Sequence, residues 1–102
     1  MCIRDSLEAV RLAPGLAIAH DNYGNLLLDL GRYAEAVVQY NTALSLDASR
    51  PETYNNIGAV LLRQGRAAEA VPYFQRALAL KPDMAMARRS LATALKYKGK
   101  PL

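Results

Sequence analysis

The chain has 102 residues, and 52% of them are apolar, which excludes a disordered tail and suffices for a packed core. A single Cys and a single His exclude an internal disulfide and a cysteine-rich metal site. The formal net charge of +4 belongs to the last segment, because residues 85–102 hold five basic side chains and no acidic one.

Residues 1–6, MCIRDS, lie outside the pattern of the rest of the chain. Their back-translation resembles a transposase end sequence used to build sequencing libraries, so we expect translated adapter here; a genuine short arm is the alternative. Residues 7–16 predict the tail of a preceding repeat, with a helix near 7–13, because Ala9, Leu12 and Pro14 match Ala77, Leu80 and Pro82. The natural N-terminus is therefore expected upstream. No apolar run is long enough to span a bilayer, and a cytoplasmic localisation is favoured.

The body of the chain repeats itself with a period of 34 residues. Residues 17–50 and 51–84 are identical at 13 of 34 aligned positions, which include Gly24/Gly58, Gly31/Gly65 and Ala36/Ala70. Residues 85–102 continue the register with Leu91, Leu95 and Gly99. Such a period indicates tandem copies of one structural unit.

Each copy carries the apolar spacing of two helices. In the first half of the first copy, the apolar positions i, i+4, i+7, i+8 and i+11 are Ala19, Tyr23, Leu26, Leu27 and Leu30. Gly31 and Gly65 are placed to end a first helix, and Pro51 suits a first helical turn. The predicted helices, antiparallel in sequence order, are 17–30, 33–46, 51–64, 67–80 and 85–97.

Two stretches, NYGNLLLDLGRYAEAVVQYNTALSLD and YNNIGAVLLRQGRAAEAVPYFQRALALKP, resemble the tetratricopeptide repeat family, and the repeats look like those of its bacterial members. The resemblance covers about residues 7–102. It rests on the period and on Gly24/Gly58, Ala36/Ala70, Tyr40/Phe74, Ala43/Ala77 and Pro82. It implies an all-α fold of helix–turn–helix repeats, stacked as an α-solenoid with a right-handed superhelix. The sequence departs from the family pattern at His20, where a large aromatic residue is usual, and at Ala48, where the repeat usually closes with Pro.

The resemblance also places the first helix of each repeat along a concave groove. Carried over by position, the groove residues are Asp21, Asn22, Asn25, Asp29, Glu52, Asn55, Asn56, Arg63, Met86, Arg89, Thr93 and Lys96. Asn22 and Asn56 recur once per repeat, which resembles the asparagine ladder of the O-linked N-acetylglucosamine transferase repeats. Because an Asn amide both donates and accepts, such a ladder could hold the backbone of an extended peptide. The alternative is that these residues are family consensus and only stabilise the helices.

The sequence therefore predicts a protein–protein interaction scaffold, a fragment of a larger protein, that binds a peptide or a partner helix. One alternative is the substrate-recruiting region of a fused enzyme such as a glycosyltransferase; another is nucleic-acid binding through the basic C-terminal helix. The family's carboxylate clamp is not expected, since its cationic positions hold Asp21, Met86 and Ser90. No catalytic, cofactor or metal site is predicted, and His20 falls at a packing position. Self-association of the fragment is expected, because Leu91 and Leu95 lack a covering helix.

Overall fold

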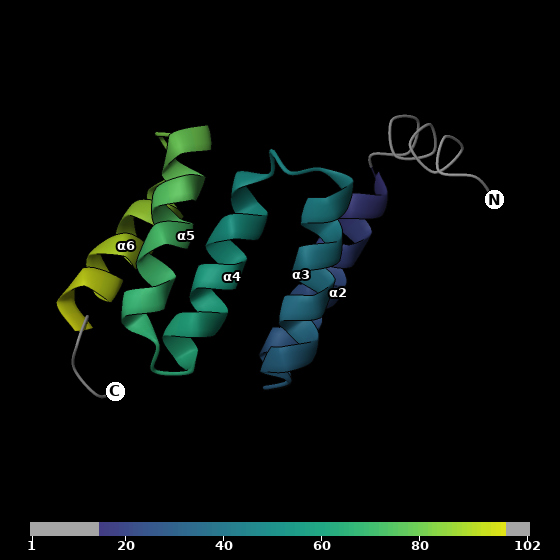
Figure 1. The fold of residues 1–102 in the computed structure, drawn as a ribbon, viewed down its shortest axis with the longest axis horizontal. Coiled ribbons are helices and arrows are strands. Elements are labelled where there is room, and N and C mark those ends of the chain that lie inside the picture. The colour runs from purple at the N-terminus through teal and green to yellow at the C-terminus, as the bar shows by residue number, and fades with distance from the viewer. Residues whose placement is uncertain (1–14, 98–102) are drawn as a thin grey trace. The chain divides into compact units, whose positions relative to one another are not determined.

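The computed structural model describes residues 15–97. Within this range there are five α-helices and no strand: α2 (Gly15–Asp29), α3 (Tyr33–Leu46), α4 (Pro51–Arg63), α5 (Ala67–Leu80) and α6 (Ala85–Tyr97) (Figure 1). The predicted all-α fold is confirmed, and the helix ends lie within two residues of those expected. The predictions for residues 1–6, for a helix near 7–13 and for residues 98–102 lie outside the described residues.

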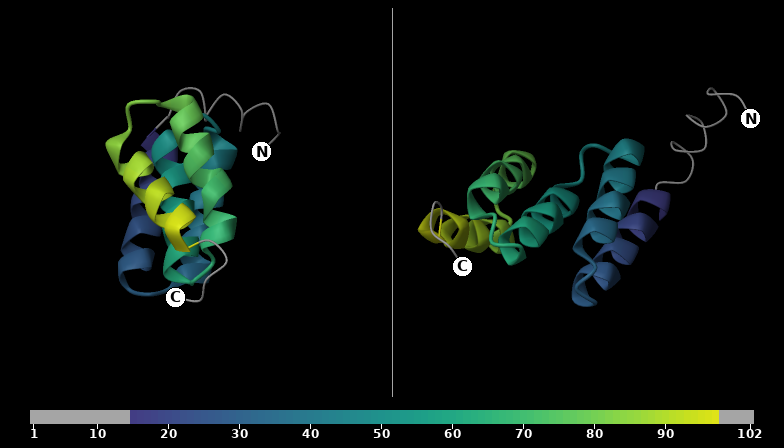
Figure 2. Two further views of the ribbon diagram at one scale, coloured as in Figure 1. Left: turned by 90° about the vertical axis from the view of Figure 1, so that its left-hand side faces the viewer. Right: turned by 60° about the horizontal axis from the view of Figure 1, so that its bottom comes forward.

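The chain separates into two compact units, Met1–Ala48 and Ser49–Leu102, which we call unit 1 and unit 2 and describe one at a time. In unit 1, α2 and α3 lie side by side and run antiparallel (Figures 1 and 2). In unit 2, α5 packs against both α4 and α6, and α6 also contacts α4. Each unit is therefore built on helical hairpins, which are the local products of the sequence repeat.

The hairpin turns owe their shape to two glycines. Gly31 and Gly65 have φ angles of 77° and 76°, in the left-handed region that side chains with a Cβ rarely adopt. In the first turn the Gly31 amide donates to the Leu28 carbonyl at 3.0 Å, and the Arg32 amide donates to the Leu27 carbonyl at 2.8 Å. This pair of bonds is the Schellman arrangement, which satisfies the last carbonyls of α2 and turns the chain into α3. The turn around Gly65 has the same two bonds, from Gly65 to Leu62 and from Arg66 to Leu61.

Close helix packing in both hairpins depends on a glycine opposite an aromatic ring. A Cβ added at Gly24 would lie 2.6 Å from Tyr40 Cε1, and one added at Gly58 would lie 2.5 Å from Phe74 Cε1. Both rings are fully buried, with 0% of their surface exposed. The absence of a side chain on the first helix therefore creates the space that the ring on the second helix fills, and the ring anchors the hairpin core.

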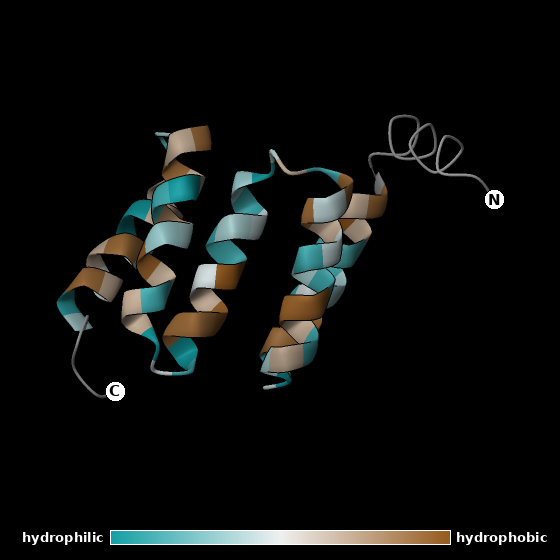
Figure 3. Ribbon diagram, in the orientation of Figure 1, coloured by the Kyte–Doolittle hydropathy of each residue, from teal (hydrophilic) through white to brown (hydrophobic). Residues whose placement is uncertain are grey.

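The helix starts have a shared ionic feature at the surface. Arg32 and Glu35 at the start of α3, and Arg66 and Glu69 at the start of α5, form ion pairs three residues apart, at 3.7 and 2.6 Å. All four side chains are more than half exposed, so each pair stabilises its helix by about 0–1 kcal/mol. Hydrophilic and apolar residues are mixed along each described helix (Figure 3), and none of these helices combines the length and the apolarity that crossing a membrane requires.

Candidate functional site

In unit 1, the predicted groove residues divide between an exposed face and the hairpin core. Asn22 and Asp29 are exposed and lie seven residues, about two turns, apart on one face of α2. Asn25 is half-buried, and its Oδ1 accepts a hydrogen bond from the Tyr40 hydroxyl at 2.6 Å. Because Tyr40 is fully buried, this bond gives the Asn25 carbonyl a structural partner inside the hairpin.

One repeat position is buried in both copies. Asp21 is 4% exposed and Asn55, the equivalent residue of the second copy, is 3% exposed. The Asn55 Oδ1 atom accepts no hydrogen bond, the one such buried side-chain atom among the residues that the structure describes. The structure therefore places these two residues below the surface rather than on the exposed face with Asn22.

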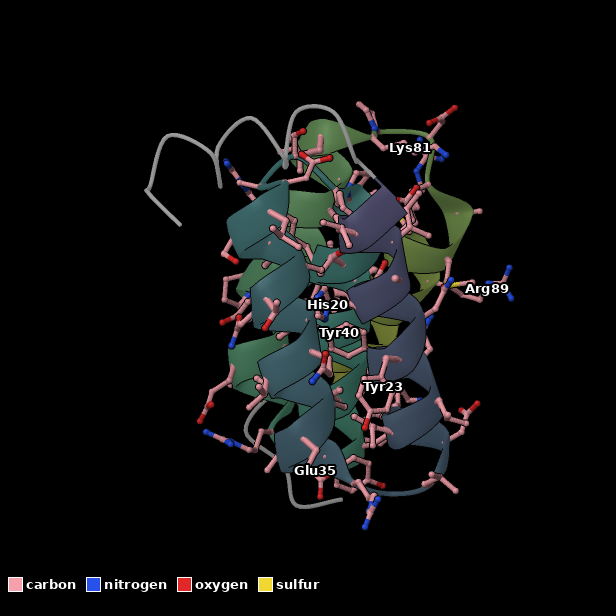
Figure 4. All side chains as sticks on the ribbon, turned by 90° about the vertical axis from the view of Figure 1, so that its right-hand side faces the viewer. His20, Tyr23, Glu35, Tyr40, Lys81 and Arg89 are labelled. Atoms are coloured by element: carbon pink, nitrogen blue, oxygen red, sulfur yellow. The ribbon has the colours of Figure 1, made fainter. Side chains whose placement is uncertain are left out.

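In unit 2, α4 and α6 contribute two neighbouring polar faces. On α4, Glu52 and Arg63 are exposed and Asn56 between them is half-buried, at the spacing i, i+4 and i+11. On α6 the spacing i, i+3, i+7 and i+10 places one stripe of exposed residues: Met86, Arg89, Thr93 and Lys96. Figure 4 shows Arg89 projecting away from the ribbon. The Thr93 hydroxyl donates to the Arg89 carbonyl at 3.0 Å, and Lys96 Nζ lies 5.7 Å from the centre of the Tyr97 ring.

The two units carry opposite charge. Residues 15–48 hold one basic and four acidic side chains, a net charge of −3, whereas residues 49–97 hold eight basic and three acidic ones, a net charge of +5. Within residues 15–97, no carboxylate lies at ion-pair distance from Arg89 or Lys96. The exposed stripe of α6 is therefore a cationic surface.

The one His has a packing role. His20 on α2 is half-buried (labelled in Figure 4), and its Nδ1 lies 2.8 Å from Oε1 of Gln39 on α3. Among residues 15–97 no group of three or more His, Cys, Asp or Glu side chains is arranged to hold a metal ion. His20 therefore joins the two helices of its hairpin.

Unit 2 also has a cavity that was not predicted from the sequence. It has a volume of about 220 Å³ and is lined by Tyr54 of α4 and by Pro72, Tyr73 and Arg76 of α5. The Arg76 guanidinium carbon lies 5.7 Å from the centre of the Tyr54 ring, a cation–π distance. The sequence did contain a hint of this cavity, because the two repeats differ at all four lining positions. The first copy has His20, Val38, Gln39 and Thr42 there.

Helical hairpins with a 34-residue period, a glycine opposite an aromatic ring and a Gly turn define a class of helical repeat proteins. Two families match the chain: one described as TPR repeat at residues 24–65, and one described as tetratricopeptide repeat at residues 51–84. The chain belongs to the tetratricopeptide repeat family, as its sequence predicts. No curated protein matches the chain. Repeats of this family generally mediate protein–protein interaction and are typically non-catalytic scaffolds that bind proteins or peptides.

Proposed function

We propose that the chain binds an extended, acidic segment of a partner protein along the exposed faces of α4 and α6 in unit 2. The observation that carries the proposal is the stripe Met86, Arg89, Thr93 and Lys96, which is exposed along the whole of α6 and has cations without a carboxylate partner among the described residues. A surface of this kind attracts acidic ligands.

The polar groups on α4 and α6 suit both the backbone and the side chains of a peptide. Asn56 has an amide group that can both donate to and accept from a peptide backbone, whatever the peptide's sequence. Arg63, Arg89 and Lys96 can pair with carboxylates, and Arg does so through two parallel hydrogen bonds. Met86, 62% exposed, offers a flexible apolar contact. The backbone contacts would therefore give affinity, and the cations would select acidic side chains.

The expected affinity is low. A neutral hydrogen bond contributes a net of about 0.5–1.5 kcal/mol, and an exposed ion pair about 0.2–1 kcal/mol. A few such hydrogen bonds and ion pairs must also offset the entropy that an extended peptide loses when it becomes ordered. We therefore expect dissociation constants in the range of roughly micromolar to millimolar.

The test is a library of extended peptides passed over the protein, followed by titration of the selected peptides at two salt concentrations. We expect acidic peptides, with binding that weakens as salt increases because exposed charges are screened. Arg89→Ser should weaken binding, and Asn56→Ala should weaken it again, whereas Gln75→Ala, an exposed change on α5, serves as the control. Selection of neutral or basic peptides, or tighter binding of a single-stranded RNA oligomer than of any peptide, would overturn the proposal.

A further inference from the structure

The cavity lined by Tyr54, Pro72, Tyr73 and Arg76 lies on a different side of unit 2 from the proposed peptide face. Each residue of an α-helix is rotated by about 100° from the one before, so Tyr54 and Asn56 point in directions about 160° apart around α4. Tyr54 shares its side of α4 with Gly58, which faces Phe74 of α5. The Tyr54 side of α4 therefore faces α5, whereas Asn56 lies on the opposite side of the helix.

We infer that this cavity is a second binding site, which takes a single aromatic side chain of a partner protein together with a carboxylate next to it. Ligand sites for small molecules have volumes of about 300–1,000 Å³. A cavity of about 220 Å³ is smaller, so it fits one side chain rather than a cofactor. The surface of its lining is mostly apolar, and two of its four lining residues, Tyr54 and Tyr73, are aromatic, which suits contact with the ring of an aromatic side chain.

The positive charge of Arg76 determines which chemical group of the ligand should lie next to the aromatic ring. Arg76 is exposed, and its guanidinium lies over the Tyr54 ring at the wall of the cavity. Among the described residues, no carboxylate is within ion-pair distance of Arg76. A guanidinium is planar and presents a fork of donors that matches a carboxylate. A ligand whose ring enters the cavity therefore meets Arg76 with whatever polar group is adjacent to the ring, and a carboxylate fits it best.

The first repeat carries other side chains at the positions of this site and has the same helical hairpin. At the equivalent positions His20 and Gln39 hydrogen-bond to each other, and Val38 and Thr42 replace Pro72 and Arg76. The same helical hairpin therefore accepts both sets of side chains. This comparison supplies two variants that should fold, Tyr73→Gln and Arg76→Thr, since each introduces the residue that the first repeat has at that position.

The experiment is a titration of the isotopically labelled protein with N-acetylphenylalanine, followed by amide chemical shifts in NMR spectra. N-acetylphenylalanine amide, which has the same ring without the carboxylate, is the matched probe. We expect both probes to shift the signals of Tyr73, Arg76 and their neighbours, and the carboxylate form to bind about two to five times more tightly, as an exposed ion pair allows. Tyr73→Gln should abolish the shifts, and Arg76→Thr should make the two probes bind equally.

Two further variants keep this site separate from the peptide face. Arg63→Thr removes another exposed Arg of unit 2, and Arg89→Ser removes a cation from α6; neither should change the binding of N-acetylphenylalanine. Shifts confined to residues outside the cavity, binding that survives Tyr73→Gln, or equal binding of the two probes to the unaltered protein would each overturn the inference. Loss of binding in Arg89→Ser would instead assign the probe to the peptide face, which also overturns it.

Discussion

Replacement of Gly58 by Ala tests whether the hairpin core is as tightly packed as the structure indicates. Ala is favoured over Gly inside a helix by about 1 kcal/mol, so the substitution would stabilise an unobstructed helix. The added Cβ, however, would lie 2.5, 2.7 and 2.9 Å from three atoms of the Phe74 ring, which is fully buried. Overpacking of this kind costs about 1–3 kcal/mol, so we expect a net destabilisation of about 0–2 kcal/mol.

The decisive comparison is the same substitution with a smaller residue at position 74. In a Phe74→Leu background the added Cβ has no ring to meet, and Gly58→Ala should become neutral or stabilise the protein by up to about 1 kcal/mol. Urea unfolding followed by far-UV circular dichroism measures the free energy of unfolding of all four proteins. If Gly58→Ala stabilises the unaltered protein as much as the Phe74→Leu variant, the close contact between Gly58 and Phe74 does not exist. On the same scale, Gly58→Leu should be far more destabilising than Ala59→Ser.

Three more predictions address the turn, the buried hydroxyl and the surface ion pairs. Gly31→Ala should destabilise the protein by about 1–2 kcal/mol, because φ is 77° while no atom lies within 4 Å of the added Cβ; Gly31→Asn, measured alongside by urea unfolding, should cost less. Tyr40→Phe should cost about 0.5–1.5 kcal/mol in unfolding free energy, and Asn25→Ala should then cost little more, because the hydrogen bond is already gone. Arg66→Ala should change the thermal midpoint only slightly in low salt and not at all in high salt; a drop that persists in high salt would contradict a screened surface pair.

The helices and turns were predictable because the signals that specify them are local. Apolar residues at helical spacing marked α3, α4, α5 and α6 to within a residue, and glycine after each first helix marked the hairpin turns. The start of α2 lies two residues before the expected one, at Gly15, because the expected start followed the 34-residue register of the repeat. The pairing of Gly24 with Tyr40 followed from the repeat, since a small residue opposite a large one recurs at the same spacing in both copies.

The environments of individual polar residues were not predictable from their positions in the repeat. Asn22 and Asn25 belong to the same predicted groove set, yet one is exposed and the other accepts a hydrogen bond from the buried Tyr40. Two residues three positions apart on a helix point in directions that differ by only about 60°. That difference is enough to place one side chain in solvent and the other at the edge of the core. Whether the groove residues bind a ligand stays a prediction, because burial alone does not show what a side chain recognises.

The second repeat suggests where the ladder hypothesis should be tested first. The hydroxyl of Tyr40 and the amide of Asn25 form a pair, and the second copy loses both members together, with Phe74 and Ala59 in their places. Asn22 and Asn56, in contrast, are the same residue in both copies, and Asn22 is exposed whereas Asn56 is half-buried. An Asn at this position can contact the backbone of a neighbouring helix or the backbone of a bound peptide, because its amide both donates and accepts. Side-chain amide signals recorded while the protein is titrated with peptide distinguish these two partners, because the Asn56 amide should shift only if the peptide contacts it.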